Sequence, residues 1–396
     1  MDAIKAFAMD GHGAIECVDM HTAGEPTRIV VKGYPDLNGT LLEQRAQAKS
    51  KYDHIRRQLI LEPRGHYDMY GALLRSDTEK IRSGEADIGV LFLTNDGYST
   101  MCGHATIALG RFLVDTQDPL VFPNRKNLQY DSSSGNVSLR LHAPCGVLHV
   151  CVPTVENGQK SDPSKPVSFT SVECFVTGLN ISISLKPENR WAELGTRTSI
   201  TADFSYGGAF YCLVPAQELG FSKGLTNFDM DAMNVATKRV KAAVNDNPDL
   251  KHLFVHPESD DLSFLYSVIV VDGKLGELLG NSRGAETGLC FFSDQEVDRS
   301  PTGSGVSARL AVAYARGKLA LGKSWTYHSL VSLHKAQQSA FVGTLLDAQK
   351  EEGNKFPRVR TQVEGYGYYT GHHTFFVEEA DPLGQDGFLM SALSHA

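Results

Sequence analysis

The sequence predicts an α+β protein that is built from two similar lobes. Its length of 396 residues exceeds one ordinary domain and favours two. Short apolar runs bounded by Gly, Asn, Asp and Pro are typical of strands, and they outnumber the stretches with helical spacing. Residues 84–111 also match residues 284–311, which indicates an internal repeat.

The expected elements follow from the hydrophobic pattern along the chain. Continuous apolar runs predict strands at 28–31, 88–93, 147–152, 210–214 and 264–271. Apolar residues at loosely helical spacing predict helices at 40–59, 103–114, 231–244 and 304–320. Polar stretches at 122–136 and 156–166 are expected to be loops.

The repeat has an offset of 200 residues, and in both copies a strand is followed by a loop, a glycine and an Ala-rich helix. The identical positions are Gly84 and Gly284, Phe92 and Phe292, Gly103 and Gly303, and Ala108 and Ala308. We therefore expect a first lobe at 1–197, completed by 374–396, and a second lobe at 198–373.

Composition excludes several classes of protein. Hydrophobic residues make up 41% of the chain, so a sizeable core can form and disorder is excluded as the main state. The net charge of −8 and the absence of a basic run argue against a nucleic-acid partner. No apolar run is long enough to span a membrane, and the N-terminal residues lack the apolar core of a secretory signal. Seven cysteines without a CxxC motif favour free thiols in the cytoplasm.

The first repeated helix begins beside a cysteine. Cys102 and Gly103 precede the apolar positions of the helix predicted at 103–114. Unpaired N–H groups and the helix dipole at such a position favour a thiolate. The alternative is a buried, inert cysteine, which is the interpretation we give to the other six, because they lie in or beside strand-like runs.

The second repeated helix begins with Thr302 in the equivalent position, followed by Gly303 and Ser304. Two helix starts of this kind, facing each other across a cleft, could hold a carboxylate through backbone N–H groups. The alternative is that Thr302 or Ser304 is only an N-cap.

The sequence gives no sign of a cofactor or metal site. It contains no H-E-x-x-H, no phosphate loop, no dinucleotide-binding fingerprint and no lysine in a pyridoxal context. His21 with Glu25 and His66 with Asp68 could be ligands, but their segments do not look helical. We expect neither a metal nor an organic cofactor, and the roles of these four residues stay open.

Six motifs stand in order along the chain: DMHTAGEPTR at 19–28, EPRGHYDMYG at 62–71, GYSTMCGH at 97–104, YGG at 206–208, DRSPTG at 298–303 and DPLGQDGF at 381–388. With these motifs the sequence resembles, over nearly the whole chain, the proline racemase family, and within it the branch of trans-3-hydroxy-L-proline dehydratases. The resemblance implies a fold like that of diaminopimelate epimerase. In that fold, two pseudo-symmetric lobes each wrap strands around a central helix, and the active site lies between the lobes.

The resemblance also implies a chemistry. Racemases of the family use two cysteines, one at the start of each central helix, and need no cofactor. Here Cys102 matches the first cysteine, and Thr302 replaces the second. A threonine hydroxyl is too weak an acid to be the second base of a racemase, whereas one base suffices to start an elimination.

The implied substrate is trans-3-hydroxy-L-proline, a cyclic imino acid, which would lose water to give Δ1-pyrroline-2-carboxylate. Cys102 would remove the Cα proton, with His104 as a helper, and Asp298 would pair with the ring ammonium. Thr302 would hold a water or shape the pocket. The substrate carboxylate would accept hydrogen bonds from the N–H groups of Gly103, His104, Gly303 and Ser304.

Two alternatives remain at this point. The chain could racemise or epimerise proline or a hydroxyproline, which needs a second acid or base, or it could be a non-catalytic member of the family. A homodimer is expected from the resemblance alone.

Overall fold

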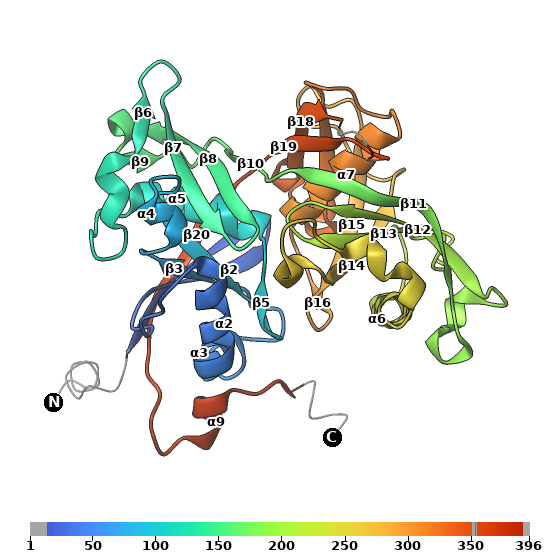
Figure 1. The fold of residues 1–396 in the computed structure, drawn as a ribbon, viewed down its shortest axis with the longest axis horizontal. Coiled ribbons are helices and arrows are strands. Elements are labelled where there is room, and N and C mark those ends of the chain that lie inside the picture. Colours follow the sequence, from blue (N-terminus) through green and yellow to red (C-terminus); the bar gives the residue numbers. More distant parts are fainter. Residues whose placement is uncertain (1–13, 351–352, 354, 391–396) are drawn as a thin grey trace. The chain divides into compact units, whose positions relative to one another are not determined.

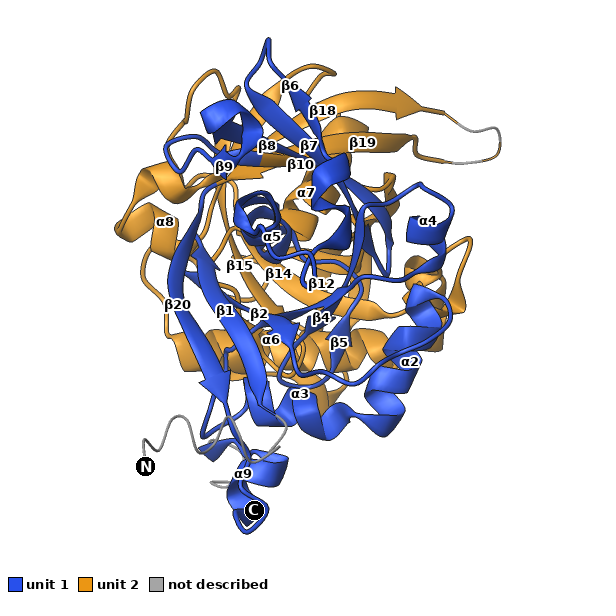
Figure 2. Cartoon of the chain, turned by 90° about the vertical axis from the view of Figure 1, so that its left-hand side faces the viewer, with its two compact units in different colours: residues 1–167, 366–396 blue, residues 168–365 orange. Residues whose placement is uncertain are grey.

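The computed structural model describes residues 14–350, 353 and 355–390, and its contacts divide the chain into two compact units (Figures 1 and 2). Unit 1 comprises Met1–Val167 and Tyr366–Ala396, and unit 2 comprises Ser168–Gly365. These limits differ from the expected lobe boundaries after residues 197 and 373, because two segments pair with strands of the other unit than expected. Strand β11 (Cys174–Ser184) pairs with strands of unit 2, and β20 (Gly367–Phe375) pairs with β1 (Ile15–Thr22) of unit 1.

Unit 1 contains most of its strands in the first 161 residues. They are β1, β2 (Glu25–Lys32), β3 (Gly71–Arg75), β4 (Ile88–Leu93), β5 (Tyr98–Ser99), β6 (Gln129–Asp131), β7 (Asn136–Ala143), β8 (Gly146–Val155), β9 (Lys160–Ser161) and β20. Its helical segments are α2 (Leu41–Lys51), α3 (Asp53–Ile60), α4 (Glu79–Arg82), α5 (Gly103–Asp115), η1 (Pro123–Asn127), η2 (Glu156–Gly158) and α9 (Pro382–Asp386). Strand β10 (Val167–Thr170) lies at the boundary.

Unit 2 has its own set of strands and helices. The strands are β11, β12 (Ser199–Tyr206), β13 (Phe210–Pro215), β14 (Leu265–Asp272), β15 (Ala285–Phe292), β16 (Glu296–Val297), β17 (Ser324–His328), β18 (Phe341–Gln349) and β19 (Arg358–Gly365). The helical segments are η3 (Pro187–Asn189), η4 (Ala192–Leu194), α6 (Met230–Asn245), η5 (Pro248–Phe254), η6 (Asp260–Leu262), α7 (Gly303–Ala315), α8 (Leu330–His334) and η7 (Gln337–Ser339).

The two units share one order of strand pairings. In unit 1, β1–β2 is antiparallel, β2–β3 parallel, β3–β4 antiparallel, β4–β7 parallel and β7–β8 antiparallel. In unit 2, β12–β13, β13–β14, β14–β15, β15–β17 and β17–β18 repeat that sequence of directions. The short β5 and β16 likewise pair with β4 and β15. This agreement confirms the pseudo-symmetric lobes that the sequence repeat predicted.

Unit 2 closes its strands into a ring. Strand β18 pairs with β19, β19 with β11, and β11 with β12, so the pairing that began at β12 returns to it. Helix α7 packs against strands around this ring, including β11, β12, β18 and β19. A closed sheet leaves no edge strand exposed, and its inner face is covered by the helix.

The repeated helices are buried because the strands surround them. In α5 every residue from Gly103 to Val114 is buried, and in α7 every residue from Gly303 to Val312 is buried. Their sequences are therefore apolar or small on all sides rather than amphipathic. The buried Arg111 of α5 keeps partners, since its guanidinium donates to Ser161 Oγ and to the carbonyl of Gly367.

Four of the five predicted strands lie within observed strands, the fifth, at 264–271, begins one residue before β14, and two predicted helices need correction. The helix expected at 40–59 is two helices, because Tyr52 leaves the helical conformation with φ −128° and ψ 18°. The helix expected at 304–320 ends at Ala315. Gly317 follows with φ 67°, and the N–H of Lys318 donates to the carbonyl of Ala313, a turn that terminates helices.

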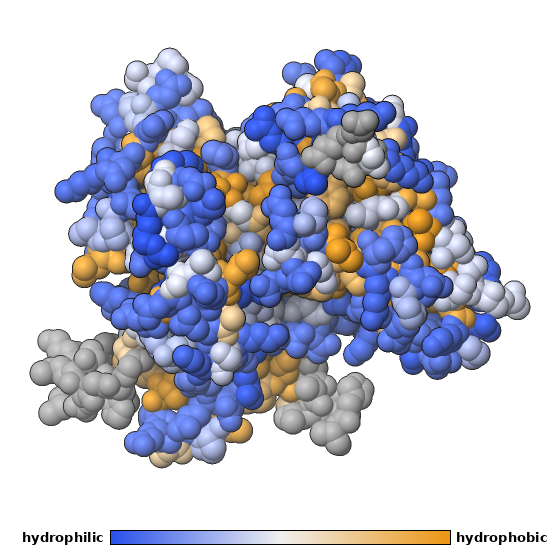
Figure 3. Space-filling model, viewed as in Figure 1, coloured by the Kyte–Doolittle hydropathy of each residue, from blue (hydrophilic) through white to orange (hydrophobic). Residues whose placement is uncertain are grey.

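The two expected loops also contain short elements. The stretch 122–136 holds η1 and β6, and the stretch 156–166 holds η2 and β9. On the face in Figure 3 hydrophilic residues predominate, with hydrophobic ones in smaller areas. Within the described residues, no helix is both long and apolar enough to cross a membrane.

Candidate active site

Cys102 is the N-cap of α5, as the sequence predicted. Its backbone is extended, with φ −146° and ψ 116°, and its Sγ accepts a hydrogen bond from the N–H of Ala105 at 3.3 Å. Cys102 is only 5% exposed, so little water competes for hydrogen bonds with the sulfur. A backbone N–H and the positive end of a buried helix together stabilise negative charge on this atom.

His104 lies against the same sulfur. Its Nδ1 is 3.2 Å from Cys102 Sγ, and its Nε2 is 3.5 Å away. Burial lowers the pKa of His104 to about 3, and a hydrogen bond with the Pro26 backbone opposes this only in part. The imidazole is therefore neutral at ordinary pH. It can exchange a proton with the Cys102 thiol, but it does not form a lasting imidazolium–thiolate ion pair.

Two residues fix the position of His104. The ring of Tyr70 stands edge-on to the imidazole with centroids 4.6 Å apart, and Thr22 Oγ1 donates to the His104 carbonyl at 2.9 Å. Thr22 and Tyr70 lie in two of the sequence motifs, at 19–28 and 62–71. Sequence reasoning missed both, although their place in those motifs was a usable signal.

The start of α7 has a different arrangement. Thr302 Oγ1 donates to Asp298 Oδ2 at 2.8 Å, and the N–H of Ser300 donates to Asp298 Oδ1 at 2.7 Å. Asp298 and Thr302 are 5% and 7% exposed. Burial raises the pKa of Asp298 to about 6, even though both hydrogen bonds lower it. Asp298 thus changes charge within a pH range that an assay can cover.

Thr302 occupies the N-cap position without acting as a cap. Its φ of 64° and ψ of 87° are left-handed, and its side chain makes no capping hydrogen bond. Left-handed backbone is unfavourable for a β-branched residue, so the surroundings must hold this conformation. The interpretation of Thr302 as a simple N-cap is therefore wrong: its hydroxyl is committed to Asp298.

Both helix starts present backbone donors. In the part of the chain that the structure describes, the N–H groups of Gly103, His104, Gly303 and Ser304 donate no hydrogen bond, as expected for the first turn of a helix. Ser304 is additionally held by its side chain, because its Oγ lies 2.6 Å from the hydroxyl of the buried Tyr211. Sequence reasoning missed Tyr211, which it had assigned only to a strand.

The four residues with open roles, His21, Glu25, His66 and Asp68, belong to unit 1. His21 accepts a hydrogen bond from the Gly24 N–H at 3.2 Å, and Glu25 is fully buried at the start of β2. His21 and His66 both line a cavity of about 480 Å³. Among the described residues, no group of three or more His, Cys, Asp or Glu side chains could hold a metal ion.

Comparison with known proteins gives consistent matches over nearly the whole chain. A family model described as "Proline racemase" matches residues 17–389. The human trans-3-hydroxy-L-proline dehydratase is 38% identical over 383 residues, which is 96% of this chain and 96% of that protein. A protein of the same name from Colwellia psychrerythraea is 33% identical over 378 residues, 95% of this chain and 92% of that one.

Two solved structures share the fold. One is a probable proline racemase from Agrobacterium radiobacter with bound carbonate. Its TM-score is 0.75 at 24% identity, covering 96% of this chain and 97% of that one. The other is a hydroxyproline epimerase from Agrobacterium vitis with bound trans-4-hydroxy-L-proline. Its TM-score is 0.74 at 23% identity, with the same coverage.

Proposed function

The chain belongs to the proline racemase family, and from this premise we propose that it is a trans-3-hydroxy-L-proline dehydratase. One observation carries the proposal: the two repeated helix starts hold a thiol at Cys102 and a hydroxyl at Thr302. A pair of thiols would serve a two-base racemase. One thiol with a hydroxyl bound to a carboxylate serves a one-base elimination.

Cys102 is the base in this proposal. As thiolate it removes the Cα proton, and the negative charge that develops on the substrate is stabilised by the N–H donors of the helix starts. The support is that the Cys102 sulfur already accepts a hydrogen bond from the α5 backbone and touches a neutral His104. In the trans isomer the hydroxyl lies on the same ring face as the Cα hydrogen, so the elimination is syn. Cys102 or His104 then returns the proton to the leaving hydroxyl, and water departs.

The remaining roles are assigned to the start of α7. Asp298, when ionised, pairs with the ring ammonium, and Thr302 holds that carboxylate through its hydroxyl. Gly103, His104, Gly303 and Ser304 bind the substrate carboxylate through their N–H groups. Loss of water leaves an enamine, which tautomerises to Δ1-pyrroline-2-carboxylate. A homodimer stays a prediction.

The proposal is tested by offering trans-3-hydroxy-L-proline to the purified protein and detecting the cyclic imine. Proline is supplied in parallel in deuterated water, and incorporation at Cα with inversion is followed. Formation of the imine without inversion of proline is the expected result. Efficient inversion of proline by the unaltered chain would instead assign a racemase.

We expect turnover to need no added metal, pyridoxal phosphate or nicotinamide, because the thiol and the helix starts supply the base and the charge stabilisation. Activity should be unchanged after dialysis against EDTA. The measurement is the initial rate, with metal content of the same sample determined by mass spectrometry. A stoichiometric metal whose removal stops turnover would contradict the mechanism.

Asp298→Asn should lower kcat/KM by about 10- to 100-fold at pH 8, since the ring ammonium loses a charge-assisted partner. The parent should lose kcat/KM as pH falls through about 6, because protonation of Asp298 removes the same charge. The variant should lack this acid limb. Asp294→Asn, at an exposed neighbouring carboxylate, is the matched control and should keep it.

Stability gives an independent readout of the same group. Burial raises the folded pKa of Asp298 above its unfolded value, so ionisation weakens the fold as pH rises through about 6. The melting temperature of Asp298→Asn should therefore improve relative to the parent between pH 5 and pH 8. A constant difference across that range would show that Asp298 does not titrate as described.

A further inference from the structure

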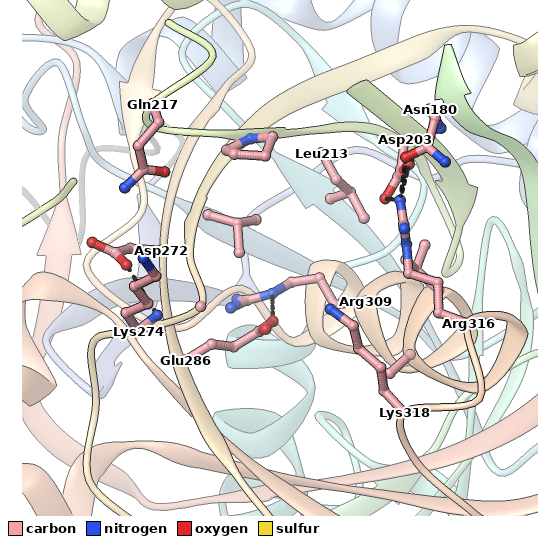
Figure 4. Close-up of a pocket in the computed structure, with 15 residues that line it drawn as sticks. Asn180, Asp203, Leu213, Gln217, Asp272, Lys274, Glu286, Arg309, Arg316 and Lys318 are labelled. Carbon is pink, nitrogen blue, oxygen red and sulfur yellow. Dashed lines mark hydrogen bonds and ion pairs between the residues drawn. The ribbon is translucent and has the colours of Figure 1, made fainter. Parts of the chain in front are cut away.

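Unit 2 contains a cavity of about 440 Å³ that the proposed reaction does not use (Figure 4). Its walls come from strands β11 to β15 and from the middle and C-terminal end of α7. Cys102, Asp298 and Thr302 are not among the residues that line it. A volume of this size suits a small molecule.

The lining carries a surplus of positive charge. Four cationic residues, Lys274, Arg309, Arg316 and Lys318, face three acidic ones, Asp203, Asp272 and Glu286. Arg316 is matched, because its Nη2 lies 2.8 Å from both carboxylate oxygens of Asp203 (Figure 4). Within the described residues, no ion pair involves the ammonium of Lys274 or of Lys318. The unmatched charge of the cavity is therefore positive.

Arg309 is the least satisfied of these groups. It is 4% exposed, and its Nε donates to Glu286 Oε1 at 2.6 Å. Its two η nitrogens are buried and have no hydrogen-bond partner among the described residues. The guanidinium rests on the buried ring of Tyr327, 4.6 Å from the centroid, and Gly288 leaves it room, since a Cβ there would lie 2.5 Å from Nη1.

Unsatisfied buried donors on a charged group are costly, and the fork of two η nitrogens matches a carboxylate. Both nitrogens are covered by neighbouring atoms, so an incoming anion would reach them by a rotation of the Arg309 side chain. The uncharged part of the wall includes the polar Asn180 and Gln217, and an apolar part formed by Leu213, Pro215, Val271 and Val312. A ligand that suits both surfaces has an anionic end and a short hydrocarbon body.

We propose that this cavity of unit 2 binds a small aliphatic monocarboxylate, with its carboxylate on Arg309 and the two lysines. A single negative charge matches the surplus of one positive charge, four cations less three acids. A dianion such as phosphate would meet Asp272 and Glu286 with an uncompensated charge, which disfavours it. The site is separate from the proposed catalytic residues and does not depend on their roles.

The test is a calorimetric titration of the full chain with sodium hexanoate. Lys318→Met should weaken binding about threefold, as expected for one exposed charge, and adding Lys274→Met should weaken it further. The double variant Arg309→Met with Glu286→Met removes the buried pair without leaving a lone charge. It should weaken binding more than about tenfold. If this variant does not fold, the lysine variants still decide the question.

Lys251→Met is the matched control, because Lys251 is exposed in unit 2 and does not line the cavity. It should leave hexanoate affinity unchanged. Hexylamine should not bind, and inorganic phosphate should bind more weakly than hexanoate. Absence of hexanoate binding, binding insensitive to the lysine variants, or phosphate binding of equal strength would each overturn the proposal.

Discussion

Cys102→Ser should reduce the dehydration of trans-3-hydroxy-L-proline by about a thousandfold or more, because general bases of this kind contribute 10² to 10⁴ in rate. A serine hydroxyl has no accessible anion near neutral pH. The fold should be unaffected, since serine is a preferred N-cap and can accept the Ala105 N–H in place of the sulfur. The measurements are the initial rate of imine formation and the melting temperature.

Cys145→Ser is the matched control for this change. Cys145 is half-buried in the turn that joins β7 to β8, and no role is proposed for its thiol. Its variant should retain parental activity. If Cys102→Ser keeps more than a few per cent of the rate with native circular dichroism, Cys102 is not the base.

Thr302→Cys should confer measurable exchange and inversion at Cα of proline, a substrate with no 3-hydroxyl to lose. The new thiol stands at the start of a buried helix, where the dipole stabilises a thiolate. The gain should be small, because the backbone at 302 is left-handed whereas that at 102 is extended. A placement error of about 1 Å costs on the order of a hundredfold in rate. Solvent deuterium incorporation with chiral separation of the products measures the effect.

Thr302→Ser separates the thiol from the loss of the threonine. It keeps a hydroxyl that can donate to Asp298, so it should show neither exchange nor inversion. Dehydration should persist in part in both variants, because Cys102 is untouched. A well-folded Thr302→Cys protein that exchanges no more than the parent would show that 302 is not the second acid–base position.

The fold was predictable where the chain repeats itself. The strand at 88–93 and the helix start at 103 were correct, and the start predicted at 304 lies one residue from the observed Gly303, because continuous apolar runs and glycines carry a strong local signal. The boundaries between the units could not be predicted in this way. The pairing of β20 with β1 joins residues about 350 positions apart, and such a pairing leaves no local pattern in the sequence.

The candidate site was predictable in identity but not in detail. Cys102 and Asp298 could be named from motifs, yet only the hydrogen bond from Thr302 to Asp298 decides against the alternative that Thr302 is a simple N-cap. That outcome depends on a left-handed backbone at a β-branched residue, which local preference argues against. Tyr70 and Tyr211 act through tertiary contacts, which a sequence does not show.

The late position of two strands has a consequence for how the chain emerges from the ribosome. The ring of unit 2 closes only through β19, which ends at Gly365, and β1 of unit 1 pairs with β20, which ends at Phe375, so both units are completed only near the end of translation. Until then β1 is unpaired on the side that β20 will cover, and β11 and β18 lack the strand that joins them. The unit whose synthesis begins first should therefore be the last to be completed, and the strand edge that β20 covers stays exposed through most of synthesis.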